Sequence, residues 1–487
     1  MEQIYTSKIK IGLLFLMFTL LGHTLYAQAL EGEVVPFVRS FPGPGDPTVI
    51  RGDMKVIGNS ILGIKGRPED ENRDYEPYEE YNGTSRNNGV FRGYIDIDSE
   101  AIFNPVFTSP LPASETEFSA PVNDYGSPIT STQSDTGTFS SSAAELTINN
   151  PLSPPGTTCS TVVKAFLYWG AMYEAESLAV RVNNRGQDND GPIIERPDCT
   201  NPDGTPCEYY TEIKILPPGA SEYIDIKANN SGADFNSLKS EVLIDGIAGG
   251  TFPQAVRDEI YVCKADVTSL FTELQNQGQP VEGNWTVANV RAVTGAKSSG
   301  SGGGWSLVVV YEDPLATFQK NISMFEGYVA ITRPSGQLSD SVEFNITGFE
   351  TIPTGPVNVD LATISLEGDI GIFGDRFEIN DENDDQTKSG TWIPMTYPGQ
   401  DASNFFDCSI YSKGPINRFP NSSNTLGYDS DHFTLLNPDN EYISNGDNEA
   451  DFRIFTQGDA YGNFFNAFAI EVIAPDLDVV KLSLIHI

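Results

Sequence analysis

The stretch Gly303-Gly304-Trp305-Ser306-Leu307-Val308-Val309-Val310-Tyr311-Glu312 decides the fold class of this chain. It is a short run of aromatic and β-branched residues, which is typical of a β-strand. Runs of the same kind recur along the sequence, and Gly, Pro, Asn, Asp and Ser separate them. They lie at residues 162–173, 209–216, 222–227, 285–292, 342–349, 357–366, 450–456 and 463–473. Many short strands with turns between them predict antiparallel sheets rather than alternating strand–helix units.

The sequence therefore predicts an all-β fold, with antiparallel β-sandwich units of jelly-roll or immunoglobulin-like type, long loops and one short helix. The helix is expected over Val267–Gln275, because Leu270, Phe271 and Leu274 recur there at helical spacing. Asp266 precedes this segment and can cap it. We expect the helix to cover an edge or an end of a sandwich.

The N-terminus has the pattern of a secretory signal peptide. Lys8 and Lys10 precede an apolar run over 11–21, and small residues follow at Ala27 and Ala29. The run is shorter than the roughly 20 apolar residues of a membrane-spanning helix, and no later stretch is long enough. We therefore expect an exported protein, secreted or held at the cell surface, that does not span a membrane.

Length and composition predict the following organisation. A signal peptide occupies residues 1–27. Residues 28–149 hold N-terminal strands with long acidic and Ser-rich insertions, 150–335 form a β-sandwich, and 336–474 form a second sandwich or continue the first. Residues 475–481 begin a truncated downstream repeat. Residues 482–487 match a translated sequencing adapter, and we interpret them as an adapter-derived scar; the alternative is a genuine apolar strand.

The net charge excludes one large class of function. The chain has 29 basic and 67 acidic residues, which gives a net charge of −38. Removal of residues 1–27 takes away two Lys and one Glu and leaves a net charge of −39. A nucleic-acid binder needs a basic face, so we expect no nucleic-acid partner. Such acidity keeps an exported protein soluble and attracts cations.

The five cysteines favour disulfide chemistry over a metal–thiolate site, because no CxxC spacing occurs. Cys199 and Cys207 flank the turn-rich segment 200–206, and a disulfide between them is the first candidate. Export to an oxidising compartment permits this bond. The odd number of cysteines leaves at least one thiol free or bonded to a partner chain.

Acidic clusters are the best candidates for binding, with calcium as the expected ion, because Ca²⁺ takes roughly six to eight oxygen ligands. Where acidic residues alternate, an extended chain points their carboxylates one way. One candidate loop begins like an EF-hand but lacks the Gly and the final Glu of that motif. In each cluster a solvated acidic surface is the alternative. The candidates are Asp96, Asp98 and Glu100; Asp381, Asn383 and Asp385; and Asp429 and Asp431.

Histidine is too scarce for the usual hydrolase triads. The chain has His23 in the signal peptide, His486 in the presumed scar, and His432. Ser-His-Asp and Cys-His triads need a histidine base, and no nucleophile motif accompanies His432. We expect His432 in an exposed loop that leads into a strand, and we expect no enzyme of this kind. Paired carboxylates would still allow a glycosidase.

Three short patterns also have simple structural explanations. Arg51-Gly52-Asp53 matches an integrin-binding tripeptide, but so short a match arises easily by chance. The Gly-rich stretch 300–304 is expected to form a flexible hairpin between its flanking strands, since a phosphate loop would need a helix after it. Trp392 and Tyr397 lie in a Gly/Pro-rich segment and could stack on sugar rings. Local loop packing is the alternative for both.

Four segments together resemble the N-terminal region of large bacterial surface proteins that precede tandem immunoglobulin-like repeats of unknown function. They are RGDMKVIGNSIL at 51–62, SSSAAEL leading to KAFLYWG at 140–170, GGWSLVVVYE at 303–312, and NFFDCSI with NTLGYD at 404–429. DLDVVK at 476–481 resembles the start of the first repeat. The resemblance implies an adhesin or matrix component with a C-terminal sorting domain, and it carries no catalytic or ligand residues over to this chain.

These observations predict a non-enzymatic exported surface or secreted protein. It would be the N-terminal head of a longer adhesin- or matrix-type protein and would bind carbohydrate or protein, with calcium as a stabilising ion. The alternative function is an extracellular hydrolase that acts on polysaccharide through paired carboxylates, and a passive spacer is a third. A pocket with two facing acids and an exposed aromatic platform would favour the hydrolase, whereas scattered acids would favour the binding protein.

Overall fold

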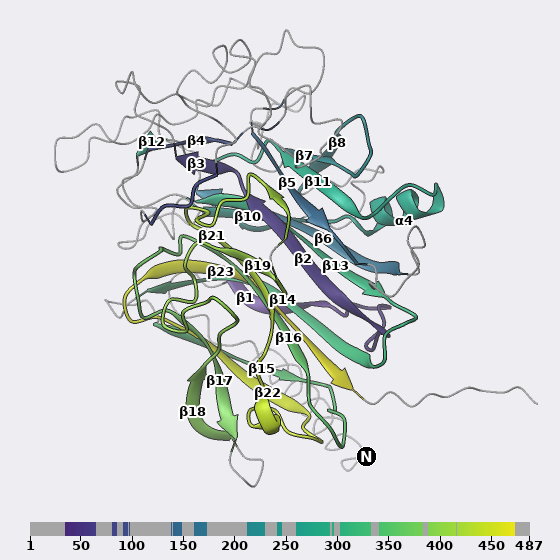
Figure 1. The fold of residues 1–487 in the computed structure, drawn as a ribbon, viewed down its shortest axis with the longest axis vertical. Coiled ribbons are helices and arrows are strands. Elements are labelled where there is room, and N and C mark those ends of the chain that lie inside the picture. Colours follow the sequence, from purple (N-terminus) through teal and green to yellow (C-terminus); the bar gives the residue numbers. More distant parts are fainter. Residues whose placement is uncertain are drawn as a thin grey trace, which may run out of the picture.

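The computed structural model describes residues 35–64, 80–84, 91–95, 97, 138, 140–148, 160–172, 212–228, 241–245, 260–292, 295–296, 302–332, 340–382, 388–414 and 416–472. Within these residues the chain is almost entirely strand, with one α-helix, α4, and one 3-10 turn, η3 (Pro438–Asn440) (Figure 1). The all-β prediction is confirmed. Among the helices in this part of the chain, none has the length and apolarity needed to cross a membrane.

Most strands belong to four sheets, and each sheet takes the name of one of its strands. The β5 sheet has the order β20 (Arg418–Phe419), β5 (Ser141–Leu146), β11 (Gly283–Ala288), β7 (Glu212–Leu216), β8 (Ile224–Lys227). The β13 sheet has the order β2 (Gly52–Ser60), β13 (Gly303–Glu312), β6 (Thr161–Met172), β10 (Ile260–Asp266), β9 (Glu241–Asp245).

The β23 sheet has the order β1 (Val35–Phe41), β14 (Gln319–Thr332), β23 (Ala460–Val472), β16 (Val359–Leu366), β21 (Tyr428–Thr434), β19 (Ile410–Ser412). The β22 sheet has the order β15 (Ser341–Thr347), β22 (Glu449–Phe455), β17 (Arg376–Glu382), β18 (Lys388–Pro394). A small sheet contains β12 (Gly295–Ala296), β4 (Phe91–Tyr94) and β3 (Leu62–Ile64). Strand pairing is antiparallel, except that β19 pairs with β21 in parallel.

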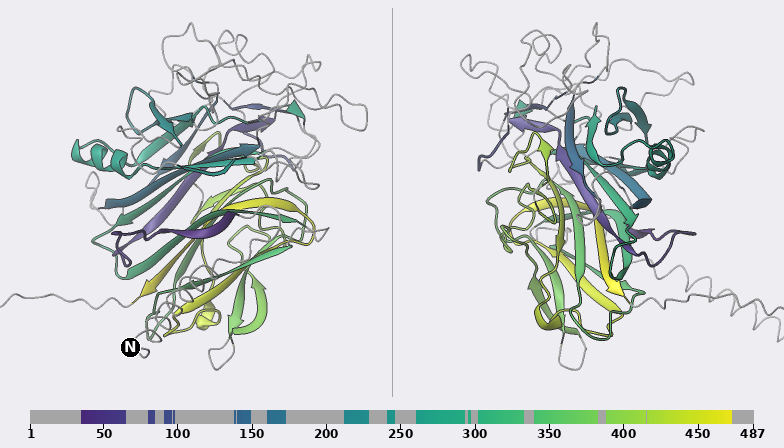
Figure 2. Two further views of the ribbon diagram at one scale, coloured as in Figure 1. Left: turned by 180° about the vertical axis from the view of Figure 1, so that it is seen from behind. Right: turned by 45° about the vertical axis from the view of Figure 1, so that its right-hand side comes forward.

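The four sheets stack in the order β5, β13, β23 and β22, and a hydrophobic core fills each gap between them (Figure 1 and Figure 2). The first core, between the β5 and β13 sheets, contains Trp285 and Trp305. The second core, between the β13 and β23 sheets, contains Tyr168. The third core, between the β23 and β22 sheets, contains Phe452 and Phe468. The predicted sandwiches therefore occur as layers of one stack.

The two-residue period of a strand lets one strand contribute to two cores. In β13, Leu307 and Val309 belong to the first core, whereas Val308 and Val310 belong to the second. Both faces of the β13 sheet are covered, so eight consecutive residues from Gly303 are buried. This double coverage explains why the sequence at 303–312 is an unbroken apolar run instead of an alternating one.

The helix forms where the sequence predicts it. It spans Thr268–Asn276, and Asp266 Oδ1 accepts the backbone N–H of Thr268 at 3.0 Å, although Val267 occupies the N-cap position. Leu270 and Phe271 are buried in the first core, and the Phe271 ring stacks on Trp285 with 4.6 Å between centroids. This packing fixes α4 to β11 through the first core.

The Gly-rich stretch before β13 is not a hairpin, which corrects the prediction. The two strands of the predicted hairpin are β11 and β13, and β12 lies between them in the chain. β11 belongs to the β5 sheet and β13 to the next sheet, so the first core separates the two. Gly302 and Gly304 of this stretch are needed for close packing against β21 and the residue before it. A Cβ atom on Gly304 would lie 2.5 Å from Cγ of Tyr428, and one on Gly302 would lie 2.2 Å from the carbonyl oxygen of Gly427.

The β23 sheet joins segments that are far apart in the sequence. β14 pairs with β1 on one side and with β23 on the other. Residues 35–41, 319–332 and 460–472 therefore lie side by side. The predicted division at 335/336 stays a prediction, and the β23 sheet takes strands from both sides of that point.

Candidate functional site

Only some of the residues predicted to bind ligands lie in the part of the chain that the structure describes. Asp381 belongs to β17, but only its backbone is described and its side chain is not. Asp429 and Asp431 are described and lie in β21. The other candidates lie outside the described residues and stay predictions; they are Asp96, Asp98, Glu100, Asn383, Asp385, and Cys199 and Cys207 of the predicted disulfide.

The alternating pair in β21 is buried in the molecule. Asp429 and Asp431 lie on the strand face that carries Phe433 of the third core, and both are 0 % exposed. Asp429 Oδ1 accepts the backbone N–H of Ser409 at 3.1 Å, and Asp431 Oδ1 accepts the hydroxyl of Tyr397 at 2.8 Å. Neither Oδ2 atom has a hydrogen-bond partner among the described residues. The alternative interpretation, a solvated acidic surface, is therefore wrong for Asp429 and Asp431.

Three further aspartates interact electrostatically with this pair or with one another: Asp375 before β17, Asp407 before β19 and Asp459 before β23. We name these five residues the carboxylate cluster. Asp375 is 0 % exposed and Asp459 is 5 % exposed. Asp375 Oδ2 accepts the backbone N–H of Phe406 at 2.8 Å. Three segments that are far apart in the sequence, each before a different strand, thus bring their carboxyls together beside the third core.

Burial raises the pKa of every carboxyl in this cluster, because a low-dielectric interior favours the neutral form. It raises the pKa of Asp375 to about 8, and repulsion from Asp407 and Asp369 adds to the effect. For Asp429, burial and then the neighbouring Asp431 hold the pKa well above its ordinary range. Burial therefore favours the neutral form of each carboxyl in this cluster, and for Asp375 the neutral form predominates near pH 7.

The spacing of the cluster bears on calcium. Among the described residues, no group of three or more His, Cys, Asp or Glu side chains is arranged to hold a metal ion. A Cβ atom on Gly368 would lie 2.5 Å from Asp429 Oδ2, so the chain packs tightly against that oxygen. The unpaired oxygens of Asp429 and Asp431 have the right chemistry for calcium, but they supply only two of roughly six to eight ligands.

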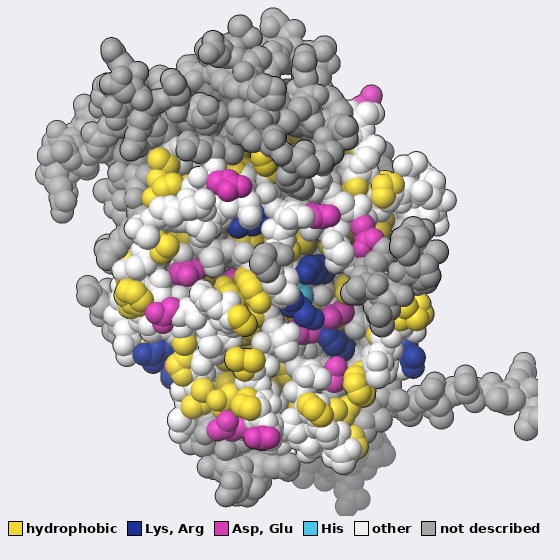
Figure 3. Space-filling view, in the orientation of Figure 1, with side chains coloured by type: hydrophobic (Ala, Val, Ile, Leu, Met, Phe, Trp, Pro, Cys, Tyr) yellow, Lys and Arg dark blue, Asp and Glu magenta, His cyan; other side chains and the backbone are white. Residues whose placement is uncertain are grey.

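A second group of charges lies at the junction of the β13 and β23 sheets, and we name Lys55, Lys320, Lys413, Asp53 and Asp360 the lysine cluster. Lys320 Nζ lies 2.9 Å from Asp53 Oδ1 and 2.5 Å from Asp360 Oδ2. Lys413 Nζ lies 2.9 Å from Asp53 Oδ2 and 2.9 Å from Asp360 Oδ2. Lys55 Nζ donates to the carbonyl oxygen of Ser412 at 2.7 Å. Figure 3 shows blue and magenta side chains gathered on one face of the molecule.

Charge pairing decides the ionisation of the lysine cluster. Burial by itself would raise the pKa of Asp360, but Lys320 and Lys413 outweigh it and hold that pKa below its ordinary range. Burial would lower the pKa of Lys320, and Asp53 and Asp360 reverse this effect and raise it. Lys55 differs from Lys320, because burial and then Lys413 lower its pKa and Asp53 only partly offsets them.

His432 lies beside the lysine cluster, and its position corrects the sequence prediction of an exposed loop. It is 0 % exposed, because β21 runs between β16 and β19 in a sheet that is covered on both faces. Burial and then Lys413 hold the pKa of the imidazole well below its ordinary range. Neither ring nitrogen has a hydrogen-bond partner within the described part of the chain. A neutral, enclosed imidazole of this kind is not placed to exchange protons with a substrate.

The Arg51-Gly52-Asp53 tripeptide is part of the same region. The carboxylate of Asp53 contacts Lys320 and Lys413 within the molecule. A Cβ atom on Gly52 would lie 1.9 Å from the carbonyl oxygen of Tyr311, so the glycine is needed for strand pairing. These contacts support a chance match and not an integrin motif.

The predicted aromatic platform is largely occupied by the protein itself. Tyr397 is 5 % exposed and stacks on Tyr411, with 4.1 Å between ring centroids. Trp392 is half-buried in β18, and the guanidinium of Arg453 lies 4.6 Å from the centroid of its ring. Local packing, the alternative for these residues, is correct for Tyr397.

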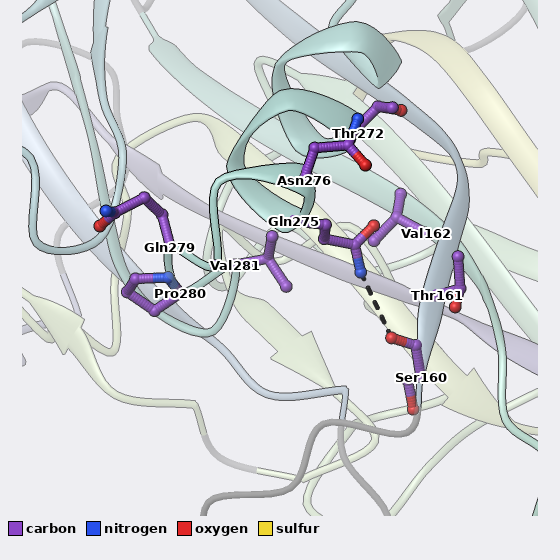
Figure 4. Close-up of a pocket in the computed structure, with 10 residues that line it drawn as sticks. Ser160, Thr161, Val162, Thr272, Gln275, Asn276, Gln279, Pro280 and Val281 are labelled. Atoms are coloured by element: carbon purple, nitrogen blue, oxygen red, sulfur yellow. Dashed lines mark hydrogen bonds between the residues drawn. The ribbon is translucent and has the colours of Figure 1, made fainter.

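A cavity of about 530 Å³ lies beside the end of α4 (Figure 4). We name it the α4 pocket. The last helical turn, the loop that follows it and the start of β6 form its walls. Gln275 Nε2 donates to the carbonyl oxygen of Ser160 at 3.3 Å, which ties the helix to β6. Its lining residues are Ser160, Thr161, Val162, Thr272, Gln275, Asn276, Gly278, Gln279, Pro280 and Val281.

Sequence reasoning missed both the lysine cluster and the α4 pocket. Lys55, Lys320 and Lys413 are separated by more than 90 positions each, so no local pattern connects them. The one available signal was a lysine inside a strand, as at Lys55 between two apolar neighbours. For the amide-rich segment 275–279, the sequence predicted only that a helix ends there.

Comparisons with known proteins do not identify this chain. No protein-family profile and no curated protein matches it. Among solved structures, the major capsid protein P2 of bacteriophage PM2 is similar at 6% identity and a TM-score of 0.16, with 69% of this chain and 99% of that chain covered. A peptide-N(4)-(N-acetyl-β-D-glucosaminyl) asparagine amidase is similar at 10% identity and a TM-score of 0.18, with 69% and 97% covered. Recombinant peptide: N-glycanase F gives 9% identity and a TM-score of 0.17, with 68% and 95% covered. At such TM-scores these likenesses carry no argument.

Proposed function

We propose that this chain is a non-enzymatic exported protein, secreted or held at the cell surface, that binds carbohydrate or protein as the N-terminal head of a longer adhesin-type molecule. One observation carries the proposal: the strongly shifted ionisable groups and the pocket are in different places. The carboxylate cluster lies beside the third core, whereas the described residues that line the α4 pocket have no ionisable side chain. Recognition through neutral hydrogen bonds fits this pocket better than acid–base chemistry.

The alternative function, a polysaccharide hydrolase with paired carboxylates, has less support. Such an enzyme needs two acids on opposite sides of an open cleft that a sugar can enter. Asp429 and Asp431 are close in sequence, but both are 0 % exposed. Apart from the group beside the blue side chains, the acidic side chains on the face drawn in Figure 3 are scattered.

Calcium remains part of the proposal as a stabilising ion. The unpaired Oδ2 atoms of Asp429 and Asp431 support it, and the spacing of the described carboxylates does not. If calcium bridges carboxylates, chelation with EDTA lowers the melting temperature, and calcium restores it. An unchanged melt rejects calcium and leaves the binding function untouched.

The binding function is tested with the purified protein and a panel of insoluble and soluble polysaccharides. We expect the protein to be retained on at least one polysaccharide, or on immobilised extracellular matrix proteins, without release of new reducing ends. Reducing ends that accumulate with time would establish the hydrolase. Export is tested by expression of the whole chain in a secreting bacterium, with mass spectrometry of the mature N-terminus. Recovery of an uncleaved chain in the cytoplasm would contradict export.

A further inference from the structure

The α4 pocket has a hydrogen-bonding inventory that is both dense and uncharged. Gln275, Asn276 and Gln279 each present an amide that donates and accepts, and Thr161 and Thr272 add hydroxyls that do the same. None of the ten lining residues that the structure describes has an ionisable side chain. A charged ligand would lose its hydration without gaining an opposite charge, which is costly. The pocket therefore selects ligands that are polar and neutral.

The position of the pocket at a helix C-terminus strengthens this selection. The backbone carbonyls at that end of α4 carry partial negative charge, which disfavours anions and favours hydroxyl donors. The helix ends in a turn at Gly278, where φ is +67°, and the backbone N–H of Gln279 bonds to the carbonyl oxygen of Leu274 at 2.8 Å. This C-terminal turn carries Asn276 and Gln279, which both line the pocket (Figure 4).

Apolar groups complete the lining. Val162 and Val281 are buried, and Pro280, the neighbour of Val281 in the chain, also lines the pocket. A sugar ring combines hydroxyls at its edge with apolar C–H groups on its faces, so it matches a wall of amides around an apolar base. The volume of about 530 Å³ falls within the roughly 300–1,000 Å³ of small-ligand sites, enough for a short saccharide.

The pocket is also held rigidly, which lowers the entropy lost on binding. Phe271 stacks on Trp285 inside the first core, and the Gln275 amide is fixed by its bond to Ser160. That bond uses Nε2 of Gln275 and leaves its Oε1 to accept from a ligand hydroxyl. Of the three amides, that of Gln275 is thus arranged before the ligand arrives.

The geometry points to a binding site for a short unit of an uncharged glycan in the α4 pocket, recognised through Gln275, Asn276 and Gln279. This inference rests on the proposed binding function and names its ligand class and its site.

The experiment uses the purified full chain and measures binding by isothermal titration calorimetry and saturation-transfer NMR. The probes are neutral cello-, malto-, xylo- and manno-oligosaccharides of two to four rings, with oligogalacturonides as an anionic counterpart and a neutral tripeptide as an amide counterpart. We expect at least one neutral series to bind, with little dependence on salt. The double variant Asn276→Ala/Gln279→Ala should weaken that binding at least tenfold.

Gln277→Ala is the matched control, because it removes the same amide from the same helix end outside the pocket lining. Its side chain bonds to Glu273 on the exposed face, so its loss should leave the affinity unchanged. Equal melting temperatures for the variants and the parent protein show that all of them fold.

Several outcomes overturn the inference. They are binding that the double variant leaves intact, equal weakening by Gln277→Ala, binding of the oligogalacturonide or the tripeptide alone, and no binding of any neutral series. Intact oligosaccharide binding in the double variant would refute the site and leave the proposed function standing. Cleavage of the probes would instead refute the proposed function.

Discussion

Two regions of the molecule bury aspartates and shift their pKa values in opposite directions. Asp360 in the lysine cluster is 4 % exposed, and its pKa is held below the ordinary range because Lys320 and Lys413 lie beside it. Asp375 in the carboxylate cluster is 0 % exposed, and burial raises its pKa to about 8. Both side chains lose water to a similar degree. The difference teaches that the charged neighbours decide whether a buried carboxyl is ionised, and desolvation alone does not.

The largest effect is expected when the lysine cluster loses a carboxylate. Asp360→Asn would leave Lys320 and Lys413 to share Asp53, with Lys55 close by. Removal of one partner from a buried ion pair typically costs about 3–5 kcal/mol, because the remaining charge stays desolvated. We expect a loss of about 3 kcal/mol in the free energy of unfolding at pH 7, measured by urea denaturation.

The control for this variant is the exposed pair between Lys227 and Glu212, whose side chains are 43% and 53% exposed. Glu212→Gln should cost less than about 1 kcal/mol. Equal losses for the buried and the exposed variant would show that the lysine cluster contributes nothing beyond an ordinary surface ion pair.

The carboxylate cluster should make the protein less stable as pH rises. The folded pKa of Asp375, about 8, is above the value of about 3.9 in the unfolded chain. The contribution is therefore fully present in acid and is lost as pH rises through the folded pKa. Between pH 6.5 and 8 the loss is about 1.4 kcal/mol per pH unit for such a group, or roughly 2 kcal/mol in all. Urea denaturation across this range measures it.

Asp375→Asn should remove this part of the pH dependence, since the amide keeps the shape and cannot ionise. Asp401→Asn is the matched control, because Asp401 is exposed and backbone bonding from Ser403 lowers its pKa. A slope that is unchanged in Asp375→Asn would mean that Asp375 is ionised in the folded protein at neutral pH.

His432 should contribute a slope of the opposite sign on the acid side. Its folded pKa is depressed, so below about pH 6.5 the unfolded chain takes up a proton that the folded protein does not. This contribution to stability is present above the unfolded pKa and is lost as pH falls. His432→Leu should flatten the loss by up to about 2 kcal/mol between pH 6.5 and 5. Identical slopes in the variant and the parent protein would place the imidazole in water.

The smallest effect should come from Lys413, whose side chain is 28% exposed. Lys413→Met should cost about 1 kcal/mol or less, because Lys320 still pairs with Asp53 and Asp360. The same change should raise the pKa of His432, since Lys413 helps to depress it. NMR titration of the imidazole measures this shift. Lys214→Met, in an exposed pair with Asp225, should leave the imidazole unaffected.

The strand content of this chain follows from local sequence. The run at 303–312 and the helix at Thr268–Asn276 could both be predicted, because residue periodicity depends on neighbours a few positions away. The stacking order of the sheets could not be predicted in this way. β1 and β14 pair across more than 270 residues, and no pattern in either strand identifies the other.

The ionisation of the acidic residues shows the same limit. Alternation correctly predicted that Asp429 and Asp431 share one face of a strand. It could not reveal that this face packs into the third core, because a second sheet, distant in sequence, covers it. For the same reason His432 was expected in solvent and lies inside a strand.

By itself, the sequence determined the all-β class, the positions of most strands and the single described helix, because a strand's period of two and a helix's period of 3.6 are written in adjacent residues. Only the tertiary structure decided which aspartates are charged, which lysines neutralise them, and where amides meet around a pocket. These properties depend on distances between segments that are remote along the chain, and electrostatic and hydrogen-bonding energies follow distance in space.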